Sequence, residues 1–200
     1  SAAEAEAAGA KVVRPEKHGV SAARNFGAKN ATGDYLLFTD ADVFFGRGAV
    51  PALMECFRSP EVGAAVGLFA KMPADRNFAS VYKNAWMRFT YKSLPDRIAL
   101  FFTSVAVIKK EVFDKSGGFD ENYASPSVED TELGRRLADS GVNIQLCRTA
   151  EVVHCRKYSI AGLLATDFKR ASALTRLFLR EKFSGSKRKN SGVEKKFSAP

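Results

Sequence analysis

The sequence has little of what marks a secreted or membrane-spanning protein. Its three cysteines, Cys56, Cys147 and Cys155, are odd in number and lack CxxC spacing, so we expect neither a disulfide framework nor a zinc site. No apolar run approaches the roughly 18 residues that a membrane-spanning helix needs, and residues 1–10 lack the apolar core of a signal peptide. These absences predict a soluble protein of a reducing, cytoplasmic compartment.

Most of the chain also lacks an excess of charge of either sign. Residues 156–200 hold 12 Lys and Arg against 3 Asp and Glu, which accounts for the whole formal net charge of +9. A nucleic-acid-binding domain would instead spread basic side chains over a folded face, so we expect no nucleic-acid partner. A basic tail indicates a local anionic partner, such as a membrane surface or another polyanion.

Helical and strand patterns alternate along the rest of the chain, which is typical of an α/β sandwich with a largely parallel sheet. Strands are expected at residues 10–15, 34–40, 61–73, 142–147 and 151–155. Helices are expected at residues 22–29, 48–59, 75–97 and 127–141.

The C-terminal part, residues 156–183, predicts a basic amphipathic helix. Its apolar residues recur three and four positions apart, and most of its Lys and Arg fall elsewhere. Such a helix can lie in an anionic leaflet, peripheral to the membrane. The alternative is a helix packed on the body with a solvated basic face. Residues 184–200 predict a disordered basic tail.

Two carboxylates interrupt the apolar stretch LLFTDADVFF at residues 36–45. Charge in apolar surroundings is costly unless it is paired, solvated or bound to a cation. Asp40 and Asp42 come where a predicted strand ends, and ligands of open α/β sheets collect beyond the carboxyl ends of the strands. Two carboxylates there can hold Mg²⁺ or Mn²⁺ beside substrate phosphates. An acidic turn after a strand is the simpler alternative.

Three blocks resemble those of family 2 glycosyltransferases, which have the GT-A fold. Residues 19–42 resemble the donor-site segment, with Ala-Arg-Asn-x-Gly ahead of a strand and Asp-x-Asp after it. Residues 117–141 are similar to the Gly-Gly-Phe-Asp-Glu, Glu-Asp and helix of the acceptor side, and EVVHCRKYS to a short strand with His. The resemblance implies a GT-A-like, Rossmann-like three-layer α/β sandwich with a mixed, mostly parallel sheet, and residues 1–155 as the catalytic domain.

The resemblance also implies a donor site for a UDP- or GDP-sugar with Mn²⁺ or Mg²⁺. Asp42 would bind the metal directly, and Asp40 would contact the ribose or reach the metal through water. His154 is the candidate third ligand, with a buried, hydrogen-bonded histidine as the alternative. Arg24 and Asn25 would serve the donor, although Arg24 can equally pair with an acid.

The catalytic residues implied are Asp130, as the base that takes a proton from the acceptor hydroxyl in an inverting transfer, and its neighbour Glu129. Acids at a helix start are also stabilised there for structural reasons alone, and we expect the helix-start amides to keep the pKa of Asp130 low. Acceptor contacts are implied for Gly118, Phe119 and Asp120, for which a turn is the alternative.

The sequence departs from the family at its start. The two strands that form the nucleotide-base pocket in relatives are absent, so we expect an N-terminally incomplete domain. The Gln-x-x-Arg-Trp motif of processive relatives is also absent, which favours transfer of a single sugar to a glycan or lipid-linked acceptor. A non-catalytic remnant that binds a sugar phosphate or a partner is the alternative.

Overall fold

The computed structural model describes residues 2–123 and 128–183, and the tail predicted to be disordered, residues 184–200, lies outside these ranges. Its six described strands form one sheet in the order β1-β5-β3-β6-β2, with β4 also paired to β6. The strands are β1 (Tyr35–Phe38), β2 (Val43–Phe45), β3 (Val62–Phe69), β4 (Arg97–Ile98), β5 (Ala106–Lys109) and β6 (Asn143–His154).

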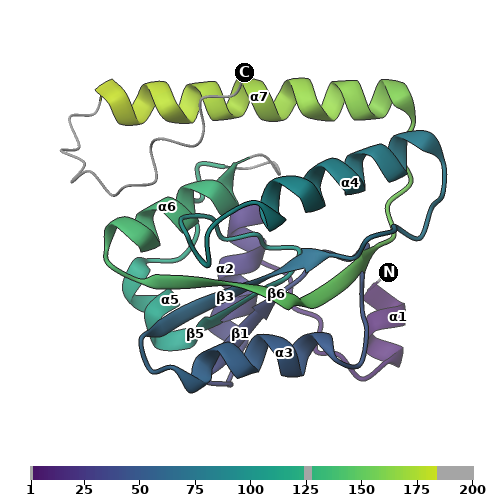
Figure 1. Cartoon of the computed structure of the whole chain (residues 1–200). Helices are drawn as coiled ribbons and strands as arrows, with labels where there is room; N and C mark the ends of the chain where they lie inside the picture. Colours follow the sequence, from purple (N-terminus) through teal and green to yellow (C-terminus); the bar gives the residue numbers. More distant parts are fainter. Residues whose placement is uncertain (1, 124–127, 184–200) are drawn as a thin grey trace.

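Helices cover both faces of this sheet, as Figure 1 shows: α3 lies on one face, α4 and α6 on the other, and α7 runs along the outside of α4 and α6. The three-layer α/β architecture predicted from the sequence is therefore confirmed. The helices are α1 (Ala2–Ala7), α2 (Val20–Asn30), α3 (Ala49–Glu55), α4 (Phe78–Lys92), α5 (Lys110–Ser116), α6 (Glu129–Asp139) and α7 (Ile160–Phe183).

The mixed sheet is confirmed, but its predicted balance, mostly parallel, is wrong. Among the described pairings, β3 with β6 is parallel and the other four are antiparallel. The strands β1 and β3, which β2 and α3 separate in the chain, run in the same direction, since both are antiparallel to β5. However, β5 enters between them in the opposite direction and pairs with both, so two strands that run parallel are not neighbours.

Two other strand predictions need correction. Residues 10–15 form no strand, because a strand needs a hydrogen-bonded neighbour and none of the described pairings includes them. The two short strands expected at residues 142–147 and 151–155 are one continuous strand, β6. It runs past β3 with a register shift between the two halves of their pairing.

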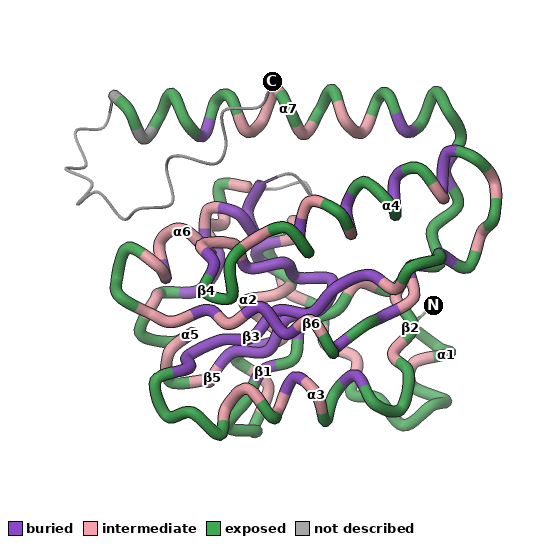
Figure 2. The backbone as a smooth tube through the Cα atoms, viewed as in Figure 1, coloured by how far each residue is buried: buried purple, intermediate pink, exposed green. Residues whose placement is uncertain are grey.

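A cluster of phenylalanine rings fixes the end of β1. The Phe38 ring lies 5.7 Å from that of Phe101 and 5.3 Å from those of Phe113 and Phe119. All four side chains are buried, and burial of each contributes about 1.5–3 kcal/mol. The buried core follows the sheet in Figure 2. This packing places the turn after β1 next to the loop that contains Phe119.

Helix α6 is seated against the backbone of a neighbouring segment at Gly134. A Cβ atom there would lie 2.4 Å from the backbone nitrogen of Phe101 and 2.6 Å from the carbonyl carbon of Leu100. Glycine therefore permits an approach that no other residue allows, and it sets the position of the first turn of α6. Within the described residues, no helix combines the length and the apolar character needed to cross a bilayer.

We predict that Gly134→Ala lowers the free energy of unfolding by about 1–3 kcal/mol, because the added methyl group meets backbone that cannot swing aside. Urea unfolding followed by circular dichroism measures this change. Gly27→Ala in α2 is the matched control, since a Cβ atom there meets nothing within 4 Å. It should instead raise the free energy of unfolding by about 0.5–1 kcal/mol. Equal effects of the two changes would contradict the close seating of α6.

Candidate active site

The two aspartates that follow β1 lie on a turn between β1 and β2. The amide of Val43 donates to the Asp40 carbonyl at 3.2 Å, and that of Cys155 donates to the Asp42 carbonyl at 2.7 Å. His154 is the last residue of β6 and pairs in register with Val43. The sheet therefore brings Asp42 and His154 together, with 3.8 Å between Oδ2 and Nε2.

Both carboxylate oxygens of Asp40 are held by other side chains. Arg24 in α2 donates to Oδ1 at 3.1 Å, and Ser104 donates to Oδ2 at 2.6 Å. Ser104 belongs to none of the motifs read in the sequence, so no local signal pointed to it. Asp40 is thus braced within the protein, whereas Asp42 is half-buried and faces His154.

Arg24 links this turn to the start of α6. Its Nη1 donates to Glu129 Oε1 at 2.6 Å, while its Nη2 reaches Asp40. The Glu129 side chain is only 4% exposed, and a carboxylate so deeply buried needs a partner of opposite charge. The guanidinium also lies over the Phe119 ring, 5.5 Å from its centroid. The geometry therefore joins the donor-side block and the acceptor-side block of the sequence through one side chain.

Asp130, the predicted base, is buried beside Glu129. The Thr131 amide donates to its Oδ1 at 2.7 Å, and Oδ2 lies 4.0 Å from Arg170 Nη2 in α7. Burial raises the pKa of Asp130, and this outweighs Arg170, the Thr131 amide and Arg24, which lower it. The expectation that helix-start amides keep this pKa low is therefore wrong, because desolvation is the larger effect.

His154 is suited to bind a cation in its neutral form. Its ring stacks on Phe69 with 4.6 Å between centroids, and burial lowers its pKa, against the opposing effect of Asp42. Bonds of about 2.1 Å to one ion leave room for two donors 3.8 Å apart, so Asp42 and His154 fit a shared ion. Among the described residues no group of three or more His, Cys, Asp or Glu is arranged for a metal, so such an ion would need further oxygens from a bound molecule.

The residues predicted to contact the acceptor form a turn that Asn25 clamps. Asn25 accepts from the Phe119 amide and donates to the Phe119 carbonyl, both at 2.9 Å. Gly118 has φ +72°, and a Cβ atom there would lie 2.6 Å from Asn25 Oδ1. Asp120 Oδ2 lies 3.5 Å from Arg180 Nη1. Asn25, predicted to serve the donor, here fixes the acceptor-side turn.

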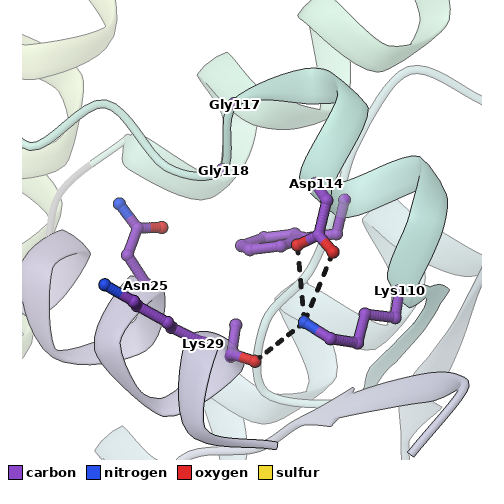
Figure 3. Close-up of a pocket in the computed structure, with 8 residues that line it drawn as sticks. Asn25, Lys29, Lys110, Asp114, Gly117 and Gly118 are labelled. Carbon is purple, nitrogen blue, oxygen red and sulfur yellow. Dashed lines mark hydrogen bonds and ion pairs between the residues drawn. The ribbon is translucent and has the colours of Figure 1, made fainter. Parts of the chain in front are cut away.

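A cavity of about 390 Å³ opens behind this clamp, between α2 and α5 (Figure 3). It is lined by Asn25 and Gly118 but by none of the four acids described above. Lys110 extends into it and contacts Asp114 and the Ala28 carbonyl, at 3.3 and 3.1 Å respectively. Lys110 and Asp114 are thus already paired with each other, and the acidic cluster lies outside this cavity.

Comparison with known proteins agrees with these blocks. The family model described as Glycosyl transferase family 2 matches residues 2–117, and one described as N-terminal domain of galactosyltransferase matches residues 86–158. Two curated relatives from Mycobacterium tuberculosis are each 26% identical to this chain, and each match covers 76% of this chain. They are a pre-mycofactocin glycosyltransferase and an N-acetylglucosaminyl-diphospho-decaprenol L-rhamnosyltransferase. The match spans 33% of the first and 57% of the second.

Solved glycosyltransferase structures share the fold. A mannosyltransferase from Pyrobaculum calidifontis, in complex with GDP-Man and Mn²⁺, superposes with a TM-score of 0.62 at 22% identity, over 86% of this chain and 46% of that one. GalNAc-T7 with UDP, GalNAc and Mn²⁺ gives 0.57 at 16% identity, over 75% of this chain and 33% of that one. The GT-A fold predicted from the sequence is therefore confirmed.

We predict that Asp130→Asn raises the free energy of unfolding at pH 8. A carboxyl whose folded pKa lies above its unfolded value favours the fold below the unfolded pKa, and this contribution is lost as the pH rises through the folded pKa. The gain should therefore shrink as the pH falls toward 4. Urea unfolding across this range measures it, with Asp139→Asn, an exposed acid at the end of α6, as the control. A gain that does not change with pH would contradict the raised pKa.

Proposed function

The chain belongs to glycosyl transferase family 2, and we propose that it transfers a single sugar, with inversion and with the help of a divalent metal, from a nucleotide sugar to an acceptor hydroxyl. The observation that carries the proposal is the Arg24 bridge. It sets Asp40, on the turn that bears Asp42, beside Glu129 and therefore beside Asp130. Donor-side and acceptor-side groups thus face one site.

The donor side rests on Asp42 and His154. The two side chains fit one Mn²⁺ or Mg²⁺ ion, which would take its remaining oxygens from the diphosphate of a UDP- or GDP-sugar. Two glycosyltransferases of similar fold are described with Mn²⁺ and with GDP-Man or UDP. When bound, such an ion neutralises charge that develops on the leaving diphosphate.

The acceptor side rests on Asp130. Inversion needs a carboxylate that takes the proton of the acceptor hydroxyl as this hydroxyl attacks the sugar from the face opposite the diphosphate. Burial raises the pKa of Asp130, which makes the ionised carboxylate a stronger base than one in water. Glu129 stays paired with Arg24, so the two adjacent acids have different roles: Asp130 accepts the proton and Glu129 holds the bridge.

We predict that Asp130→Asn lowers kcat for transfer by about 10²–10⁴-fold, because it removes the general base, and leaves Mn²⁺-dependent donor binding unchanged. Asp42→Asn should instead weaken that binding. Turnover and calorimetric binding are measured on the full-length protein with a panel of UDP- and GDP-sugars. Asp139→Asn should match the wild type in both assays. Donor binding without turnover in the wild type would support a non-catalytic binding module and contradict the enzyme.

The acceptor that we propose is a glycan or a lipid-linked sugar at the cytoplasmic face of a membrane. One relative acts, by its name, on a diphospho-decaprenol lipid. The outward side of α7 carries Ile160, Leu164 and Phe168 at intervals of four residues, all more than 60% exposed. Exposed aromatic residues also line α4, namely Phe78, Tyr82, Trp86 and Phe89. Aromatic and basic side chains beside an apolar helix face are typical of an interfacial segment.

We predict that the protein sediments with vesicles that contain phosphatidylserine and only weakly with pure phosphatidylcholine, because Lys169 and Arg176 on α7 add electrostatic attraction. Replacing Leu164 and Phe168 together by serine should weaken binding on the order of tenfold or more. Val50→Ser, on α3 at the opposite face of the sheet, is the control (Figure 1). Binding that is indifferent to lipid charge and to the serine substitutions would contradict membrane docking through α7.

A further inference from the structure

We propose that Arg170 of α7 positions the Asp130 base, so that the C-terminal helix is part of the active site. This inference rests on the proposed function, because it assigns a partner to the base named there. Arg170 Nη2 lies 4.0 Å from Asp130 Oδ2, although the two residues are 40 positions apart in the chain. The sequence alone predicted a membrane surface, not the active site, as the partner of this helix.

The position of Arg170 on α7 is the first argument. Leu163 and Leu177 are buried, and Arg170 lies midway between them, seven residues from each. Since seven residues make two helical turns, all three share the side of α7 that packs on the body. A guanidinium on a packed side is costly unless a partner of opposite charge compensates it, and Asp130 is that partner.

Contacts along its length hold α7 in this place. Near its start, Lys83 in α4 forms an ion pair with Asp167, and Leu163 packs with Ala79 and Tyr158. Near its end, the Arg135 guanidinium of α6 lies 4.8 Å from the Phe178 ring centroid. The helix is thus fixed on α4 before Arg170 in the chain and on α6 after it, and Figure 2 shows α7 running along both helices.

The surroundings of the Arg170 guanidinium make it an orienting group. Burial disfavours its charged form, but Asp130 and Tyr91, a buried residue of α4, raise its pKa. Thr131 holds Oδ1 of Asp130 through its amide and hydroxyl. Oδ2 therefore remains for the acceptor hydroxyl. Arg170 is too distant to donate a hydrogen bond to Oδ2, but its charge keeps the Asp130 carboxylate ionised and oriented.

The charged and titratable groups that face Asp130 come from every helix packed around it. Arg170 in α7 and Arg24 in α2 favour its carboxylate, Glu129 in α6 opposes it, and Tyr91 in α4 is held neutral because burial raises its pKa. Of the two arginines, Arg170 lowers the pKa of Asp130 more. Its loss should therefore make Asp130 harder to ionise and move the acidic limb of the kcat/KM profile to higher pH.

The test compares Arg170→Gln, Arg170→Lys and a matched control, Lys182→Gln, which removes an exposed charge from the same helix. For Arg170→Gln we expect kcat to fall by roughly 10- to 100-fold at neutral pH with little change in donor KM, together with the shifted acidic limb. Arg170→Lys should restore the position of the limb and part of the rate. Lys182→Gln should match the wild type. An unshifted limb in a folded Arg170→Gln variant would overturn the proposal and leave Arg170 a structural ion pair.

A second readout does not need turnover. The titration of Asp130, followed by ¹³C NMR of its carboxyl carbon, should move to higher pH in Arg170→Gln and in Arg170→Met, which removes the charge and keeps a long side chain at this position. If the wild type transfers no sugar but this titration moves as expected, the proposed function fails and the placement of Arg170 stands. If Arg170→Gln does not fold, Arg170→Met decides, and an unchanged titration there overturns the proposal.

Discussion

The candidate site depends on one guanidinium, that of Arg24, which is shared by two carboxylates from distant parts of the chain. Asp40 follows the strand β1, Glu129 begins the helix α6, and each accepts a hydrogen bond from a different nitrogen of the same side chain. The planar fork of arginine suits such a bridge because it stays charged and presents its donors at fixed angles. This bridge compensates the charge of the buried Glu129 and holds the acidic turn against α6.

Around that bridge, four acids take four different roles because their surroundings differ. Asp40 is braced by Arg24 and Ser104, and Glu129 is buried and paired. Asp42 is half-buried beside a neutral histidine, while Asp130 is buried, lies 4.0 Å from the Arg170 guanidinium and has a raised pKa. A buried acid of raised pKa close to acids that are paired or half-buried is typical of active sites, in which different surroundings give like residues different functions. This division supports a transferase more directly than the motif alone.

Helix α7 has two sides with different consequences. One side carries Leu163, Arg170 and Leu177 against the body, and the other presents Ile160, Leu164 and Phe168 outward. A surface that binds the outward side would therefore act on the same helix that supplies a charge to the base. The sequence indicated the amphipathic pattern with most Lys and Arg off the apolar face, but it did not indicate that Arg170 lies beside Asp130.

The sequence by itself determined the features that depend on neighbours along the chain. The helical periodicity of α6 and α7, the acids after β1 and at the start of α6, and the blocks shared with relatives could all be read locally, since a period or a motif needs no tertiary contact. The tertiary structure alone decided what depends on distant partners. It placed β5 between two parallel strands, turned Asn25 into a clamp on the acceptor side, and brought Ser104, Tyr91 and Arg170 to the acids. It also reversed the expected pKa of Asp130, because desolvation is a property of the packed molecule and is not encoded in any short stretch of residues.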